Sequence, residues 1–137
     1  YPESQWLALW KQIVTRYKDN SYVIGCDLRN ELRSTTVNGR HLSPSWGTGD
    51  NATDWRLAAI KVAREIQAIN ADLLIIVEGI NYALDLQGVA THPILDSDLS
   101  VPHKLVYSSH DYSWSQSSDA YQQLSKTLDA NWGFIFQ

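Results

Sequence analysis

The sequence has little or nothing of several features that would each indicate a class of protein. It has one cysteine, Cys26, so no disulfide framework can form within these 137 residues. No apolar run approaches the ~20 residues that a membrane-spanning helix needs. The net charge is −4 and no basic cluster occurs, which argues against nucleic acid or an anionic membrane surface as a partner. A glycine-rich GxGxxG motif and a P-loop are both absent, so a nucleotide site has no support.

Methionine is absent as well, so Tyr1 is not a translation start, and no signal peptide precedes the first helical pattern. The other end stops on the apolar run Trp132–Gln137. We therefore expect an internal piece of a longer protein. What is present is a globular composition, with 44% hydrophobic and 19% charged residues, which suits one modest domain with a core of its own.

Apolar periodicity predicts helices and strands that alternate along the chain. Helices are expected at Pro2–Lys18, Thr53–Asn70 and about Asp119–Ile135, and strands at Tyr22–Asp27, Leu73–Val77 and Leu105–Ser109. The long stretches 32–51 and 81–103 are expected to be irregular. Alternation of this kind predicts a parallel sheet with right-handed crossovers. It fits a doubly wound sheet or part of a (β/α)8 barrel.

Polar side chains follow each expected strand at its carboxyl end. Asn30 and Glu31 come after the first strand, Glu78 after the second, and His110 and Tyr112 after the third. Parallel α/β folds bind their ligands at this edge of the sheet. A barrel would bring all of these side chains to one mouth.

The same runs resemble glycoside hydrolase family 5, the cellulase family of retaining (β/α)8 enzymes. The likeness rests on VIGCDLRNE at the fourth barrel strand, LLIIVEG at the fifth and LVYSSHDYSW at the sixth, with TDWRLAAIKVAREI as the helix after the fourth strand. It implies an α/β fold, a partial TIM barrel running roughly from strand 4 through helix 6. Residues 1–137 would then be a fragment of a single catalytic domain, since a whole barrel needs about 250 residues. The family usually has proline after the Asn-Glu pair, and Leu32 stands there in this chain.

The resemblance also implies roles for the polar residues. Glu31 matches the general acid/base, and Asn30 matches the amide that hydrogen-bonds the 2-hydroxyl group of the sugar. His110 and Tyr112 match the pair that flanks the nucleophile, a second glutamate on the seventh strand and therefore outside this chain. A general acid must be protonated at working pH, so we expect the surroundings of Glu31 to raise its pKa.

The implied activity is hydrolysis of β-linked glucans such as cellulose by retaining double displacement. The partner would be a β-glucan polysaccharide or oligosaccharide, with no cofactor and no metal, and the protein would be secreted. The fragment alone should be inactive because it lacks the nucleophile. Two alternatives stay open: a carbohydrate-binding relative that has lost catalysis, and an enzyme of the same family that acts on mannan or another β-glycan.

The tryptophans divide into two groups. Four fall on the apolar stripes of expected helices and are predicted to lie in the core: Trp6, Trp10, Trp55 and Trp132. Trp46 and Trp114 fall on loops at the expected active face. Aromatic rings suit the C–H faces of sugars, so these two either stack on substrate or fasten their loops to the barrel.

Other polar groups have simpler explanations. Glu78 either lines the cleft or hydrogen-bonds backbone, and the second role is favoured. The acidic run 96–98 could touch calcium, but a solvated loop is strongly favoured, and the four histidines have no ligand spacing. The adjacent Ser109, His110 and Asp111 do not indicate a serine hydrolase, because neighbours on a strand face opposite ways and no GxSxG motif occurs.

Overall fold

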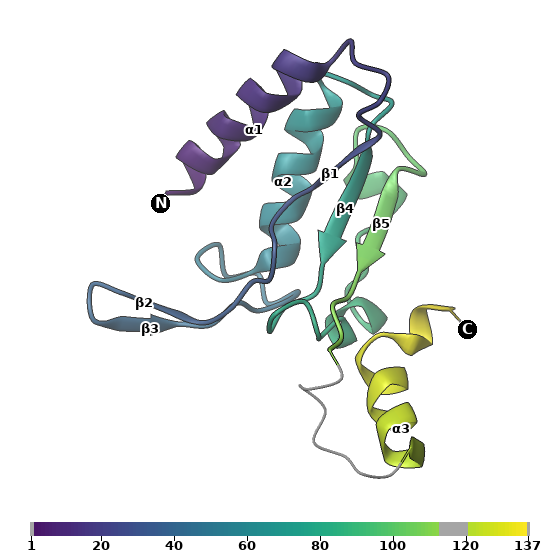
Figure 1. The fold of residues 1–137 in the computed structure, drawn as a ribbon. Coiled ribbons are helices and arrows are strands. Elements are labelled where there is room, and N and C mark those ends of the chain that lie inside the picture. Colours follow the sequence, from purple (N-terminus) through teal and green to yellow (C-terminus); the bar gives the residue numbers. More distant parts are fainter. Residues whose placement is uncertain (1, 113–120, 137) are drawn as a thin grey trace.

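The computed structural model describes residues 2–112 and 121–136. A parallel sheet of three strands lies at its centre, in the order β1 (Gly25–Asp27), β4 (Leu74–Glu78) and β5 (Leu105–Ser108). Gly25 of β1 pairs with Leu74 of β4, and on the other side of β4 Glu78 pairs with Ser108 of β5. The three strands therefore end at one edge, at the lower end in Figure 1.

Two helices pack side by side over one face of the sheet: α1 (Glu3–Tyr17) and α2 (Trp55–Gln67) (Figure 1). Asp54 caps the N-terminus of α2, and its side chain accepts a hydrogen bond from the Leu57 N–H, 3.4 Å away. The expected helices at Pro2–Lys18 and Thr53–Asn70 are confirmed, and both are shorter at each end than the apolar pattern suggested. Of the helices in the described ranges, none combines the length and apolarity needed to cross a membrane.

The core lies between α2 and the central strand β4. Val62 and Ile66 of α2 and Ile75 and Val77 of β4 are fully buried. Burying a side chain of this size stabilises the fold by about 1.5–3 kcal/mol. Leu74 and Ile76, which alternate with these residues of β4 and so point to its other face, are only half-buried, and the apolar run is therefore fully covered on one face among the described residues.

The first strand is shorter than expected. The assigned strand begins at Gly25, preceded by one hydrogen bond from the Leu74 N–H to the carbonyl oxygen of Ile24 (2.9 Å), and the side chains of Tyr22 and Ile24 are 93% and 72% exposed. The physical reason is that β1 lies at the edge of the sheet and pairs only with β4 among the described residues. The residues just before Gly25 have the apolar composition of a strand, but among the described residues no strand lies on their outer side.

A β-hairpin lies in the stretch that was expected to be irregular. It consists of β2 (Thr35–Val37) and β3 (Arg40–Leu42), which pair antiparallel and project from the body at the end where the central strands finish (Figure 1). Asn38 and Gly39 join them with φ of 51° and 76°. Two successive positive φ values are typical of a type I′ turn, for which Asn-Gly is the preferred sequence.

Short 3-10 helices interrupt the second long connection, η1 (Gln87–Ala90) and η2 (Asp96–Asp98), and the chain ends in α3 (Tyr121–Asn131) and η4 (Gly133–Phe136). The backbone N–H of Leu86 donates to the carbonyl oxygen of Asn131, 2.9 Å away. This bond ties α3 to the end of the sheet that carries the polar residues. The expected start of this helix, Asp119, lies outside the described residues.

Candidate active site

Hydrogen bonds fix the main chain at Leu28, three residues before Glu31. The ladder continues one residue beyond β1, with the Leu28 N–H donating to the carbonyl oxygen of Ile76 (3.0 Å), and the indole N–H of Trp10 donates to the Leu28 carbonyl oxygen (3.3 Å). Leu28 is buried, and the chain then turns outward through exposed Asn30. Glu31 itself has φ of +46°, in the left-handed region that residues with a side chain rarely adopt.

Glu78 lies beneath Glu31 and is fully buried. Its Oε2 accepts a hydrogen bond from the backbone N–H of Glu31, with a distance of 2.7 Å. Its carbonyl oxygen accepts one from the indole N–H of Trp55, 2.8 Å away. The side chain thus satisfies the N–H of the strained residue, which is the backbone role that the sequence analysis favoured over direct lining of the cleft.

His110 and Tyr112 converge on the carboxylate of Glu31 from the chain segment after β5. His110 Nδ1 lies 3.0 Å from Glu31 Oε1, and the Tyr112 hydroxyl donates to the same oxygen at 2.9 Å. The other ring nitrogen of His110, Nε2, is 3.3 Å from Glu78 Oε1. The carbonyl oxygen of Ala83 accepts from the His110 backbone N–H (3.1 Å) and so fixes the histidine.

These contacts lower the pKa of Glu31, mainly through the His110 hydrogen bond and then that of Tyr112. The expectation of a raised pKa is therefore wrong for this structure. The reason is that two donors, expected beside the nucleophile, contact Glu31 instead. The same hydrogen bond raises the pKa of His110. Burial raises the pKa of Glu78, and the nearby carboxyl group of Asp27 adds to this effect.

Trp46 is not available to a sugar ring. It is 9% exposed, and its indole N–H donates to the carbonyl oxygen of His92, 2.8 Å away. Its ring lies 6.1 Å from that of Tyr107, and a Cβ at Gly88 would come within 2.5 Å of it. The structure therefore contradicts the stacking role and supports the alternative, in which Trp46 fastens its loop to the connection between β4 and β5. Trp114 lies outside the described residues.

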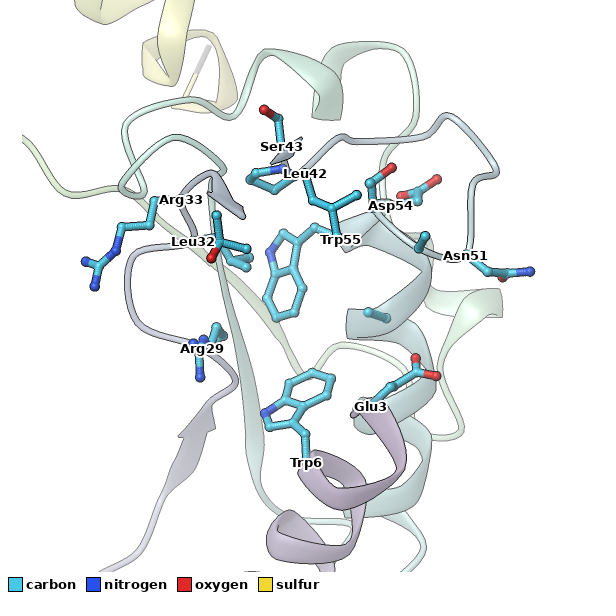
Figure 2. Close-up of a pocket in the computed structure, with 15 residues that line it drawn as sticks. Glu3, Trp6, Arg29, Leu32, Arg33, Leu42, Ser43, Asn51, Asp54 and Trp55 are labelled. Atoms are coloured by element: carbon cyan, nitrogen blue, oxygen red, sulfur yellow. The ribbon is translucent and has the colours of Figure 1, made fainter. Parts of the chain in front are cut away.

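A cavity of about 440 Å³ adjoins the segment that carries Glu31. Arg29, Leu32 and Arg33 line one side of it, and the rings of Trp6 and Trp55 line the other (Figure 2). The ring centroids of the two tryptophans are 5.8 Å apart. Trp55 is 5% exposed and Trp6 packs against the core, as their positions on helical stripes predicted. The cavity could not be predicted from the sequence, because it forms between separate elements and has no local sequence pattern.

Metal ligands do not gather here. In residues 2–112 and 121–136, no group of three or more histidine, cysteine, aspartate or glutamate side chains could hold a metal ion. Within these ranges the polar residues of the site are acids, an imidazole and a phenol. Such groups can donate, accept and transfer protons.

Comparison with known proteins places the chain among cellulases. The model of the cellulase family, glycosyl hydrolase family 5, matches residues 1–137. An endoglucanase of Paenibacillus polymyxa is 39% identical over an alignment 153 residues long, gaps included, and the alignment covers 98% of this chain. The major extracellular endoglucanase of Xanthomonas campestris pv. campestris is 42% identical over 80 residues, which cover 58% of the chain.

Solved structures agree. The catalytic domain of the Xanthomonas campestris endoglucanase superposes with a TM-score of 0.80 at 30% identity, over 98% of this chain and 41% of that one. An endocellulase from Pyrococcus horikoshii, in complex with cellotetraose, superposes with a TM-score of 0.81 at 26% identity. The superposition covers 98% of this chain and 42% of the endocellulase chain.

The chain spans 36% of the Paenibacillus relative and 15% of the Xanthomonas relative. Its parallel strands and covering helices correspond to part of a TIM barrel, so the expected partial barrel is confirmed. On the family model and the similarity to these endoglucanases, the chain belongs to the cellulase family, glycosyl hydrolase family 5.

Proposed function

We propose that the protein containing this chain is a retaining endo-β-glucanase and that Glu31 is its general acid/base. The observation that carries the proposal is the position of Glu31. Its carboxylate is partly exposed at the carboxyl end of the sheet and is contacted by His110 and Tyr112. The relatives named endoglucanase support the reaction class, and the cellotetraose complex of the Pyrococcus endocellulase supports a β-linked glucan such as cellulose as substrate.

Retaining hydrolysis requires a second carboxylate about 5–5.5 Å from the acid/base. Glu78 cannot supply it, because a fully buried side chain does not reach a sugar. We therefore assign the nucleophile to a part of the protein outside these residues, as the family resemblance implies. Residues 1–137 alone should then bind or position substrate poorly and should not turn it over.

The lowered pKa of Glu31 suits the second half of the cycle, in which the ionised group removes a proton from water. The first half needs the protonated form. A nucleophile carboxylate within about 5.5 Å would raise the pKa of Glu31 by like-charge repulsion. It would also compete for the donors His110 and Tyr112, as expected of the pair that flanks a nucleophile. Both effects would favour the protonated acid before substrate is cleaved.

Substrate contacts follow from the same assignment. Asn30, exposed and next to Glu31, is proposed to hydrogen-bond the 2-hydroxyl group of the sugar at the cleavage site. Trp114 is retained as a proposed stacking surface. We also propose secretion, because one relative is named as an extracellular endoglucanase.

The test uses the full-length protein and carboxymethylcellulose. Glu31→Gln keeps the shape of the side chain but removes the proton donor, so the rate should fall by ~10²–10⁴-fold. Glu65→Gln is the matched control, because Glu65 lies on the flank of α2 that faces α1, where it pairs with Lys11 at 2.7 Å rather than with a residue of the candidate site. This control should keep wild-type activity.

Two results would contradict the proposal. Undiminished activity of Glu31→Gln would move the acid to another residue. Binding of the polymer by the wild type without any cleavage would favour the carbohydrate-binding alternative.

A further inference from the structure

We propose that Glu78 is a positioning residue for Glu31: it holds the main chain of Glu31 through the backbone N–H and its carboxyl group through His110. The inference rests on the proposed function, in which Glu31 is the acid/base. It adds a buried residue that would control catalysis without touching the substrate.

The contacts form a closed ring. Glu78 Oε2 accepts from the Glu31 backbone N–H at 2.7 Å, and Glu78 Oε1 faces His110 Nε2 at 3.3 Å. His110 Nδ1 in turn contacts Glu31 Oε1 at 3.0 Å. Glu31 is therefore held at two points, its backbone and its carboxylate, and both connections pass through one buried carboxyl group.

The backbone connection fixes an unusual conformation. At φ of +46°, the left-handed conformation costs a residue with a side chain about 1–2 kcal/mol. A surrounding structure must compensate for that strain if the conformation is to persist. The hydrogen bond to Glu78 does so directly, and the direction of the Glu31 side chain follows from the backbone that it fixes.

The second carboxyl oxygen of Glu78, Oε1, can still accept a hydrogen bond. Oε1 is fully buried and has no aligned hydrogen bond among the described residues, although His110 Nε2 is close. A buried polar atom without a partner is costly. Protonation of His110 would supply the missing donor, because both ring nitrogens then carry a proton.

Five titratable groups thus share one environment. Asp27 lies beside Glu78 on the neighbouring strand, Glu31 and His110 face it from the connections after β1 and β5, and Tyr112 contacts Glu31. Because the charge of Glu78 favours protonated His110, its removal should make His110 lose its proton at lower pH. Neutral His110 stabilises ionised Glu31 less, so Glu31 should keep its proton to higher pH.

The test uses two variants of the full-length enzyme. Glu78→Met removes both oxygens at similar volume, whereas Glu78→Gln keeps an acceptor for the Glu31 N–H but removes the charge. Each is compared with wild type on a cellulose oligomer and on dinitrophenyl cellobioside, whose leaving group departs without protonation. Glu31→Gln and Glu65→Gln are assayed beside them.

For Glu78→Met we expect kcat on the oligomer to fall by ~10²-fold with little change in KM, because the acid is displaced. The loss should be much smaller on dinitrophenyl cellobioside when formation of the glycosyl-enzyme is measured. A residue that only supports the fold would impair both substrates alike. For Glu78→Gln we expect most of kcat to return and the alkaline limb of the pH profile to move to higher pH.

The outcomes separate the two proposals. If Glu31→Gln keeps its activity, the proposed function itself fails. If Glu31→Gln loses activity while Glu78→Met behaves like wild type, or loses activity equally on both substrates, only the positioning role fails. Should Glu78→Met not fold, the pH profile of Glu78→Gln decides, and an unmoved alkaline limb overturns the inference.

Discussion

The indole N–H of Trp46 donates to the carbonyl oxygen of His92, 2.8 Å away and 46 positions along the chain. The bond joins the loop before α2 to the connection between β4 and β5. Trp46→Ala in the full-length protein should lower the free energy of unfolding by about 3–5 kcal/mol, as expected for loss of a buried tryptophan. Thermal or urea unfolding measures this.

Trp46→Phe is the matched control: it keeps a six-membered ring but loses the N–H and the five-membered ring of the indole, so it should cost about 1–3 kcal/mol, less than Trp46→Ala. KM for cellulose oligomers should stay close to wild type in both variants, measured where they are folded. A large rise in KM without loss of stability would restore the sugar-stacking role.

The left-handed backbone of Glu31 predicts an unusual order of stability. Glu31→Ala and Glu31→Gly both remove the carboxylate, so both should abolish the proposed acid catalysis. Glycine adopts positive φ without strain, so the glycine variant should be more stable than the alanine variant by about 1 kcal/mol.

The same pair of substitutions at Glu65, within α2, should give the opposite order, because alanine exceeds glycine by about 1 kcal/mol in a helix. Denaturant unfolding of all four variants is the measurement. Equal stability of the two Glu31 variants would show that its backbone relaxes in solution.

The Glu31–His110 contact predicts how stability depends on pH. The lowered pKa of Glu31 contributes stability above its unfolded pKa of about 4.3, and this is lost as pH falls through the folded value. The raised pKa of His110 contributes stability below its unfolded pKa of about 6.5, and this is lost as pH rises through the folded value. Both contributions are present together between these two unfolded values.

Unfolding midpoints across this range measure the effect. His110→Gln keeps a donor but not the charge, so its stability should vary less with pH on both sides of the window. A variant curve parallel to that of the wild type would contradict the contact.

The exposed edge of β1 predicts that residues 1–137 associate when produced alone. Tyr22 and Ile24 are 93% and 72% exposed beside β1, a short strand that has a neighbour on one side only among residues 2–112 and 121–136, and such an edge is a template for pairing with another chain. Ile24→Lys should increase the monomer fraction in sedimentation velocity.

Leu95→Lys is the control, because Leu95 is also exposed, at 53%, but lies far along the chain from β1. If both lysines increase the monomer fraction equally, general hydrophobicity rather than the strand edge drives association. A monomeric wild-type chain with a cooperative melt would contradict the prediction.

Local sequence patterns predicted helices and strands well where burial alone determines the pattern. The apolar run of β4 and the stripe of α2 were both found, because burial sets these patterns directly. The hairpin was missed although Asn38-Gly39, a strong turn signal, was in the sequence. The short β1 could not be foreseen, since the length of a strand also depends on where its neighbour begins, here at Leu74 of β4, and not on its own sequence alone.

The sequence indicated which residues gather at the candidate site better than it indicated the contacts among them. The ends of three strands brought Glu31, Glu78 and His110 together, as parallel topology requires. The direction of the Glu31 pKa was wrong, because it depends on which oxygen each donor reaches. Sequence spacing carries no such information.

The β2–β3 hairpin leaves and rejoins the body at anchored points. Before it, Glu31 is tied to Glu78, and after it the N–H of Ser45 bonds Thr53 while Asp54 accepts from Gly47 and Gly49. The segment between is largely exposed and closes on its own turn. The hairpin is therefore expected to be an exchangeable module: a hairpin of different length or sequence can be grafted there, which changes the lining of the adjoining cavity while the contacts of Glu31 with Glu78 stay in place.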